Sequence, residues 1–270
     1  MSETNLAEVR PARYRAVVLQ ALARLSGGDM DPDTVHRART HLRRLQAYLE
    51  LLGEDRNAEA IARSVMRLSK LRTLQVFERY LSKRDAPRAD RKAVKRRLRA
   101  ERKKLDRART YAAIERIVLR HALPPTPANQ EWLAERMRAA RHAHAEAFRQ
   151  LSAGIGPKPR RKTLHRLRLL LKSIRYQEEW ALGRPYAMPA LVQRLKRAQA
   201  VLGEYEDMFQ FRRLARALDL RFSAAIRQHL RKARKRARAL PAHLSETIED
   251  IAGRRIRLVD DRREQEPATG

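Results

Sequence analysis

The chain has 270 residues, of which 62 are Lys or Arg and 31 are Asp or Glu, so its formal net charge is +31. This excess of positive charge predicts a polyanionic partner, such as nucleic acid, an acidic membrane surface or polyphosphate. The absence of cysteine excludes disulfides, thiolate metal sites and cysteine nucleophiles.

No run approaches the roughly 20 apolar residues that span a bilayer. Residues 1–28 carry charges throughout and contain no apolar segment of signal-peptide type. We therefore expect a cytoplasmic protein with no membrane partner.

Almost every segment predicts a helix, because apolar residues recur every three or four positions. Asp31 followed by Pro32 is typical of a helix start, and Gly53 is typical of a helix end. The expected helices lie at about 11–25, 32–53, 56–82, 87–121, 129–151, 164–183, 189–218 and 220–240, with a short ninth at 242–253.

The proline-rich segment 124–127 predicts a linker between two sets of four helices. We expect a single domain over residues 1–252, with halves at 6–122 and 128–252, followed by a flexible tail at 253–270. The fold class is all-α, with the two halves related by pseudo-twofold symmetry around a basic central channel.

An internal repeat supports this arrangement. Segments 35–53 and 164–183 align when His36 is placed on His165, and Glu50 then falls on Glu179. In both copies a histidine and several cations border the apolar face of the helix rather than the opposite face. Cations at that edge predict a groove for an anion between the two helices. These residues are His36, Arg39 and Arg43 in the first copy, and His165, Arg168, Lys172 and Arg175 in the second.

Both copies resemble the signature of the conserved-histidine alpha-helical domain, the CHAD family. That pattern is a histidine, an arginine three residues later, and basic residues at seven, eight and ten. The matching residues are His36, Arg39, Arg43 and Arg44, then His165, Arg168, Lys172 and Arg175. The family's leucine–glycine pair and nearby aspartate are matched by Leu202, Gly203 and Asp207.

The first half matches that second element only in part, through Leu68, Ser69, Arg72 and Val76. Gln46, Ser69, Thr73 and Ser173 depart from the family pattern. These departures predict either a less complete anion grip by the first half or different packing of its third helix. The resemblance implies an all-helical fold of two halves, with a basic cavity that binds inorganic polyphosphate. It also implies association with polyphosphate granules.

Two further helices carry dense positive charge and are candidates for lining the channel, although such charge runs are usually solvated faces. Their candidate residues are Lys95, Arg99, Arg102, Arg227, Arg231, Arg234 and Arg238, and Arg72 joins them from the third helix. Glu50 and Glu179 are expected to hold arginines in place. The histidines have a second interpretation, in which each caps or bridges backbone groups within its own half.

The leading functional hypothesis is non-enzymatic binding of inorganic polyphosphate. The alternative is a basic helical protein that binds nucleic acid, although its aromatic residues are too scattered to predict a base-stacking platform. A third hypothesis is a polyphosphate-processing enzyme. The chain has no phosphate-binding GxxxxGK[ST] loop, no nucleophile–base constellation and no carboxylate cluster for a metal. We therefore expect no catalytic residues, no metal site and no cofactor.

Overall fold

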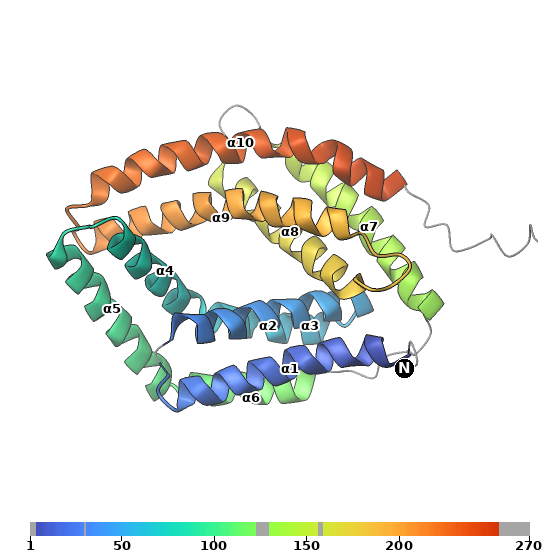
Figure 1. The fold of residues 1–270 in the computed structure, drawn as a ribbon, viewed down its shortest axis with the longest axis horizontal. Coiled ribbons are helices and arrows are strands. Elements are labelled where there is room, and N and C mark those ends of the chain that lie inside the picture. Colours follow the sequence, from blue (N-terminus) through green and yellow to red (C-terminus); the bar gives the residue numbers. More distant parts are fainter. Residues whose placement is uncertain (1–3, 30, 123–129, 156–158, 254–270) are drawn as a thin grey trace, which may run out of the picture.

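The computed structural model describes residues 4–29, 31–122, 130–155 and 159–253, and the regular elements in these ranges are all α-helices (Figure 1). The expected all-helical fold is therefore confirmed. Within these ranges none of the helices combines the length and apolar character that crossing a membrane requires. The helices are α1 (Thr4–Ser26), α2 (Pro32–Leu52), α3 (Asp55–Arg67), α4 (Ser69–Lys83), α5 (Arg88–Arg107), α6 (Thr110–His121), α7 (Gln130–Ala153), α8 (Arg161–Ala181), α9 (Pro189–Ala217) and α10 (Ser223–Gly253).

The linker expected at 124–127 lies outside the described residues, as does the expected tail after its first position. Six helices precede that linker and four follow it in the described part of the chain, where the sequence predicted four on each side.

Helix α2 begins and ends where the sequence predicts. The Asp31 side chain accepts a hydrogen bond from the backbone N–H of Asp33 at 3.0 Å, and Pro32 occupies the first turn. Gly53 follows the helix with φ +79°, in the left-handed region that glycine adopts without strain. Local caps therefore define the helix that carries the first histidine motif.

The expected third helix, 56–82, is divided at Leu68 into α3 and α4. Ile61 and Leu68 are buried in a hydrophobic cluster with α1 and α2, whereas Phe77 and Leu81 are buried in a second cluster with α9. The break redirects the chain from one cluster to the other.

The expected fourth helix, 87–121, is also divided. Helix α5 ends at Arg107, and Arg109 has φ +45° before α6 begins at Thr110. At roughly 100° per residue, Ile114 falls on the side of a continuous helix opposite Leu105. Both are buried in the same cluster, so a turn is needed to bring them to one core.

Two predicted helix boundaries near prolines are wrong. Helix α10 continues to Gly253 with Pro241 inside it, so the expected stop and the separate ninth helix do not exist. Leu230 and Leu244 on either side of this proline are buried in one cluster, and their burial stabilises the continuous helix. Helix α1 begins at Thr4, which places Pro11 in its interior rather than in its first turn.

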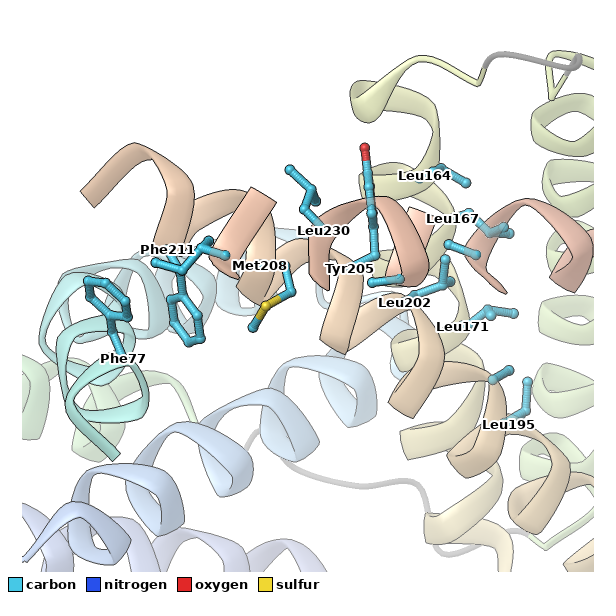
Figure 2. Packing of buried hydrophobic residues seen from close by; sticks show 14 of the residues in the cluster. Phe77, Leu164, Leu167, Leu171, Leu195, Leu202, Tyr205, Met208, Phe211 and Leu230 are labelled. Atoms are coloured by element: carbon cyan, nitrogen blue, oxygen red, sulfur yellow. The ribbon is translucent and has the colours of Figure 1, made fainter. Parts of the chain in front are cut away.

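Buried apolar residues form three clusters. Helices α1–α6 form the first, which takes Leu42 and Leu45 from α2. The second joins α4 and α5 to α7–α10, and Figure 2 shows Phe77 of α4 beside Phe211 of α9, with ring centroids 4.7 Å apart. A third cluster joins the C-terminal ends of α2 and α8 to α7. The segments before and after the linker therefore share a hydrophobic core.

Helices α2 and α8 contact one another, although their apolar stripes enter different clusters. Polar side chains bridge this contact. Ser173 of α8 donates to Glu50 of α2 at 2.7 Å, and Arg44 of α2 donates to Glu179 of α8 at 3.1 Å. These bonds are reciprocal, because the residues of one pair match those of the other in the sequence repeat. A two-fold axis would produce this pattern at the crossing, and such an axis for the whole fold stays a prediction.

A carboxylate from α5 connects the two halves at another place. Asp90 is buried and accepts hydrogen bonds from the backbone N–H groups of Phe222 at 2.9 Å and Arg221 at 3.3 Å, just before α10 begins. An acceptor at a helix N-terminus satisfies donors that have no partner inside the helix.

We expect Asp90→Ala to lower the free energy of unfolding by about 1–3 kcal/mol, because two backbone donors lose their acceptor. Urea denaturation followed by circular dichroism measures this change. Asp90→Asn keeps one carbonyl acceptor and should lose less. Equal stability of the wild type and both variants would contradict the role of Asp90.

Candidate functional site

The cationic edges of α2 and α8 come together in the structure. Arg39 and Arg43 of α2 both lie within electrostatic reach of Arg168 on α8, and Lys172 is within reach of all three. Arg72 of α4 joins them from a third helix. We refer to the whole set as the cationic cluster, which comprises His36, Arg39, Arg43, Arg72, Arg168, Lys172 and Arg175.

Neutral groups hold two arginines of the cluster in place. Arg39 donates to the backbone carbonyl of Val65 at 2.9 Å and to the hydroxyl of Ser69 at 2.6 Å. Arg72 donates to the backbone carbonyl of Pro32 at 3.1 Å. A carbonyl or hydroxyl orients a guanidinium without neutralising it, so the positive charge of both arginines stays available to an anion.

The electrostatic state of the cluster reflects its crowding. Burial, followed by the charges of Arg168 and Arg43, lowers the pKa of Lys172 to about 6. Burial and Arg43 lower the pKa of Arg39 to about 10. Burial and Arg72 also lower the pKa of His36. Lys172 and Arg39 share one cause, because little water and too few negative charges surround them, whereas His36 is more exposed.

The carboxylates near the cluster are fewer than its basic residues. They are Asp33, Glu50, Glu179 and Asp207. Asp207 lies on α9, where burial raises its pKa while Arg168 and Lys172 act to lower it. Two of the others already accept hydrogen bonds, since Glu50 is bound by Ser173 and Glu179 by Arg44. The cluster therefore keeps an excess of positive charge.

The two halves contribute differently to this excess. In the first half, Ser69 replaces the family glycine and its hydroxyl accepts a hydrogen bond from Arg39. At the matching place on α9, Gly203 leaves open space, since an added Cβ would meet no atom within 4 Å. The buried Nε of Arg168 has no hydrogen-bond partner in the described part of the chain. Arg168 in the second half therefore has fewer hydrogen bonds to the protein than Arg39 in the first half.

Tyr176 belongs to the site although the sequence did not indicate it. Its buried ring lies 4.4 Å from the guanidinium carbon of Arg175, a distance at which a cation interacts with the ring face. Its phenol group is within electrostatic reach of Arg39 and Arg43. The available signal was its position four residues after Lys172, on the same side of α8.

His165 has a carboxylate neighbour. Its Nδ1 atom lies 3.5 Å from Glu206 of α9, which also accepts a hydrogen bond from Arg161 at 2.8 Å. Burial acts to raise the pKa of Glu206, but the close approach of His165 and the hydrogen bond from Arg161 prevail and lower it to about 2. This neighbour belongs to the same half as His165, but it is a side-chain carboxylate, whereas the alternative interpretation expected the histidine to bridge backbone groups.

Arg44 lies on the edge of α2 opposite to Arg39 and Arg43, although it shares Glu179 with Arg175 of the cationic cluster. Its guanidinium donates two hydrogen bonds to Glu179, at 3.2 and 3.1 Å, and contacts His41 at 3.2 Å. These groups line a pocket on the other edge of α2. The expectation that Glu179 holds an arginine is met by this pair.

Arg102 is also placed away from the cluster. It is buried and donates to the backbone carbonyls of Gly28 at 3.3 Å and Asp29 at 2.8 Å, so it holds the turn between α1 and α2. Lys95 is exposed and pairs with Glu78 at 3.5 Å on neighbouring α4.

The remaining candidates lie on α5 and α10. Arg99 is exposed, as are three arginines of α10, while Arg238 is partly buried. Helix α10 packs against α7 and α9 and forms the upper edge of the view in Figure 1. The exposed arginines of α10 are Arg227, Arg231 and Arg234. The charges found acting on Lys172 come from α2 and α8 instead.

Comparison with known proteins identifies the family. A family profile described as CHAD domain matches residues 12–216. The chain belongs to the CHAD domain family. A structure described as the crystal structure of the CHAD domain from the plant Ricinus communis is similar, with a TM-score of 0.60 at 17% sequence identity. That alignment covers 95% of this chain and 93% of the plant chain, and it shows a shared fold. A search of curated proteins finds no match.

The described part of this CHAD domain contains no group of three or more His, Asp or Glu side chains placed to hold a metal ion.

We expect Lys172→Met to raise the melting temperature by a few degrees when no polyanion is present. The unfolded chain holds the lysine proton up to about its ordinary pKa near 10.4, whereas the folded protein loses it at about 6. The unfolded state thus binds more protons between these values, and the lysine destabilises the fold most at low pH.

The gain from Lys172→Met should accordingly be larger at pH 6 than at pH 9, as measured by differential scanning calorimetry. The matched control is Lys196→Met, which removes an exposed lysine and should shift the melting temperature little. A lower melting temperature for Lys172→Met at both pH values would contradict this assignment.

Proposed function

We propose that this CHAD domain binds inorganic polyphosphate at the cationic cluster without catalysing a reaction. The observation that carries the proposal is the convergence of basic side chains from α2, α4 and α8 beside fewer carboxylates. Polyphosphate carries about one negative charge per phosphate along a flexible thread. Such a ligand needs several cations in succession rather than one closed pocket.

The residue types of the cluster suit phosphate. Arginine offers paired N–H donors that match two phosphate oxygens. Lysine offers a mobile point charge. A phosphate beside Lys172 would favour its charged form and raise its pKa, so binding would take up a proton. The ligand would thereby supply the negative charge that the cluster lacks.

We further propose that the protein acts in the cytoplasm and associates with polyphosphate granules through this site. The support is the family resemblance together with the charge of the cluster. Association with granules would require no additional surface, because the granule presents the same ligand.

Replacing Arg39 and Arg168 by glutamine should weaken polyphosphate binding by at least about tenfold, because each arginine would lose charge-assisted hydrogen bonds to phosphate. Isothermal titration calorimetry with polyphosphate of defined length measures the affinity. The matched control replaces exposed Arg99 and Arg234, which removes the same charge from the outer surface. A larger loss in this control pair would place binding on the outer helices.

A competition experiment with the wild-type protein distinguishes polyphosphate from nucleic acid as the preferred ligand. Short polyphosphate should displace labelled single-stranded DNA at a lower phosphate concentration than DNA displaces labelled polyphosphate. The reverse order would favour a nucleic-acid-binding protein. Release of phosphate on incubation with polyphosphate and Mg²⁺ or Mn²⁺ would contradict a non-enzymatic role.

Polyphosphate affinity should increase as the pH falls from about 8 to 6. Free Lys172 has a pKa of about 6 and bound phosphate raises it, so the complex holds more protons than the free protein above pH 6. The extra affinity is complete below the free pKa and is lost as the pH rises through the pKa of the complex.

Titrations at several pH values test this dependence. Lys172→Arg keeps its charge throughout and should flatten the slope above pH 7. Replacing both histidines, as His36→Gln with His165→Gln, should leave the pH dependence of polyphosphate affinity above pH 7 in place. An unchanged slope in Lys172→Arg would assign the proton uptake to another group.

A further inference from the structure

A second set of cations lies on the opposite edge of α2. Arg37, His41 and Arg44 are spaced by four and three residues, so they share one side of the helix. They line an open pocket of about 530 Å³ between α1, α2 and the ends of α8 and α9. The pocket has the size of a small-molecule site, for which a few hundred to about 1,000 Å³ is typical.

One wall of the pocket is aromatic. The rings of Tyr14 and His41 lie 5.7 Å apart between centroids, and the guanidinium carbon of Arg44 lies 5.5 Å from the Tyr14 ring. Val17 and Leu182 add apolar surface. A planar ring of a ligand could pack against this wall, since aromatic and guanidinium planes stack favourably.

The cations of the pocket come from α1, α2 and α9, whereas the only carboxylate among its described lining residues is Glu179, which Arg44 already binds at 3.1 Å. Arg24 is occupied by Asp29 at 2.8 Å, and Arg10 donates to the backbone carbonyl of Trp180 at 2.8 Å. Three exposed cations remain at the rim: Arg13 of α1, Arg37 of α2 and Lys196 of α9. These three residues belong to three different helices.

This pocket is not a second copy of the cationic cluster. The matching positions on α8 are Arg166 for Arg37, Leu170 for His41 and Ser173 for Arg44. The repeat thus preserves the cluster edge of the helix, but it keeps only one of these three basic residues on the pocket edge. A separate ligand accounts for such a difference better than an extension of the polyphosphate site.

We propose that this pocket binds a nucleotide, with its base against Tyr14 and His41 and its phosphates at Arg13, Arg37 and Lys196. A nucleotide joins a planar ring to phosphates, which are the two features that the aromatic wall and the cationic rim would recognise. The proposal does not depend on polyphosphate binding, because it uses the other edge of α2.

Calorimetric titration with ATP tests the pocket, with tripolyphosphate as a probe that lacks the ring. Arg37→Ser with Lys196→Ser should weaken ATP binding by at least about tenfold through lost charge-assisted contacts. Tyr14→Leu should weaken ATP binding more than tripolyphosphate binding. Arg39→Gln with Arg168→Gln alters the cluster and should leave ATP bound.

Photolabelling with 8-azido-ATP gives a readout that does not depend on substitutions. Label on the peptide that contains Tyr14 or His41 supports the pocket. Label on residues 165–176, or ATP binding that survives the Arg37/Lys196 change and is lost with Arg39 and Arg168, would assign ATP to the cationic cluster and overturn the proposal. Failure to bind ATP at millimolar concentration would overturn it as well.

Discussion

The structure depends on how α2 and α8 cross. Each helix turns its apolar stripe into a different hydrophobic cluster, so the edges that flank the stripes are left facing one another. Those edges carry Arg39, Arg43, Arg168 and Lys172, which repel each other. The crossing is stabilised by the shared third cluster and by the reciprocal bonds of Glu50 and Glu179. Packing that is favourable elsewhere thus holds together charges that would separate in water.

This arrangement has a cost in the free protein. Lys172 loses its proton at about pH 6, so the folded state lowers its own charge rather than bear the full repulsion. Neutral carbonyl and hydroxyl partners orient Arg39 and Arg72 without relieving that repulsion. A site of this kind destabilises the fold when no counter-charge is present, and stability is commonly traded in this way where function requires unfavourable electrostatics. The polyphosphate proposal explains why such a compromise would be kept.

Structural features that depend only on neighbouring residues could be predicted from the sequence. The start and end of α2 follow from Asp31, Pro32 and Gly53, and the two histidine helices follow from their period. The divisions at Leu68 and Arg109 could not, because each depends on which distant core the following residues enter. A proline suggested a stop inside α10, but burial on both sides outweighed that local signal.

The same distinction applies to the site. Arg39 and Arg168 were predicted from the repeat, and the structure brings them within electrostatic reach. Arg44 fits the same motif, yet its partner Glu179 is 135 residues away in the sequence. Arg102 lies in a dense basic run and is nevertheless buried against a backbone carbonyl 73 residues away. Residue spacing shows which side of a helix a cation occupies, whereas its role depends on the partner that the fold supplies.

Matching polar positions in the two halves of the repeat have different partners. The first half uses Arg44 to bind Glu179 and Ser69 to engage Arg39, so two of its polar positions maintain structure. The second half has Ser173 and Gly203 at those places, and Arg168 keeps an unpartnered donor. Glu179 also approaches Arg175 at 3.6 Å, so this one carboxylate lies between the cluster and the pocket beyond α2. The two copies of the motif therefore share the basic edge that forms the cluster, whereas His41 and Arg44 on the pocket edge are present only in the first copy.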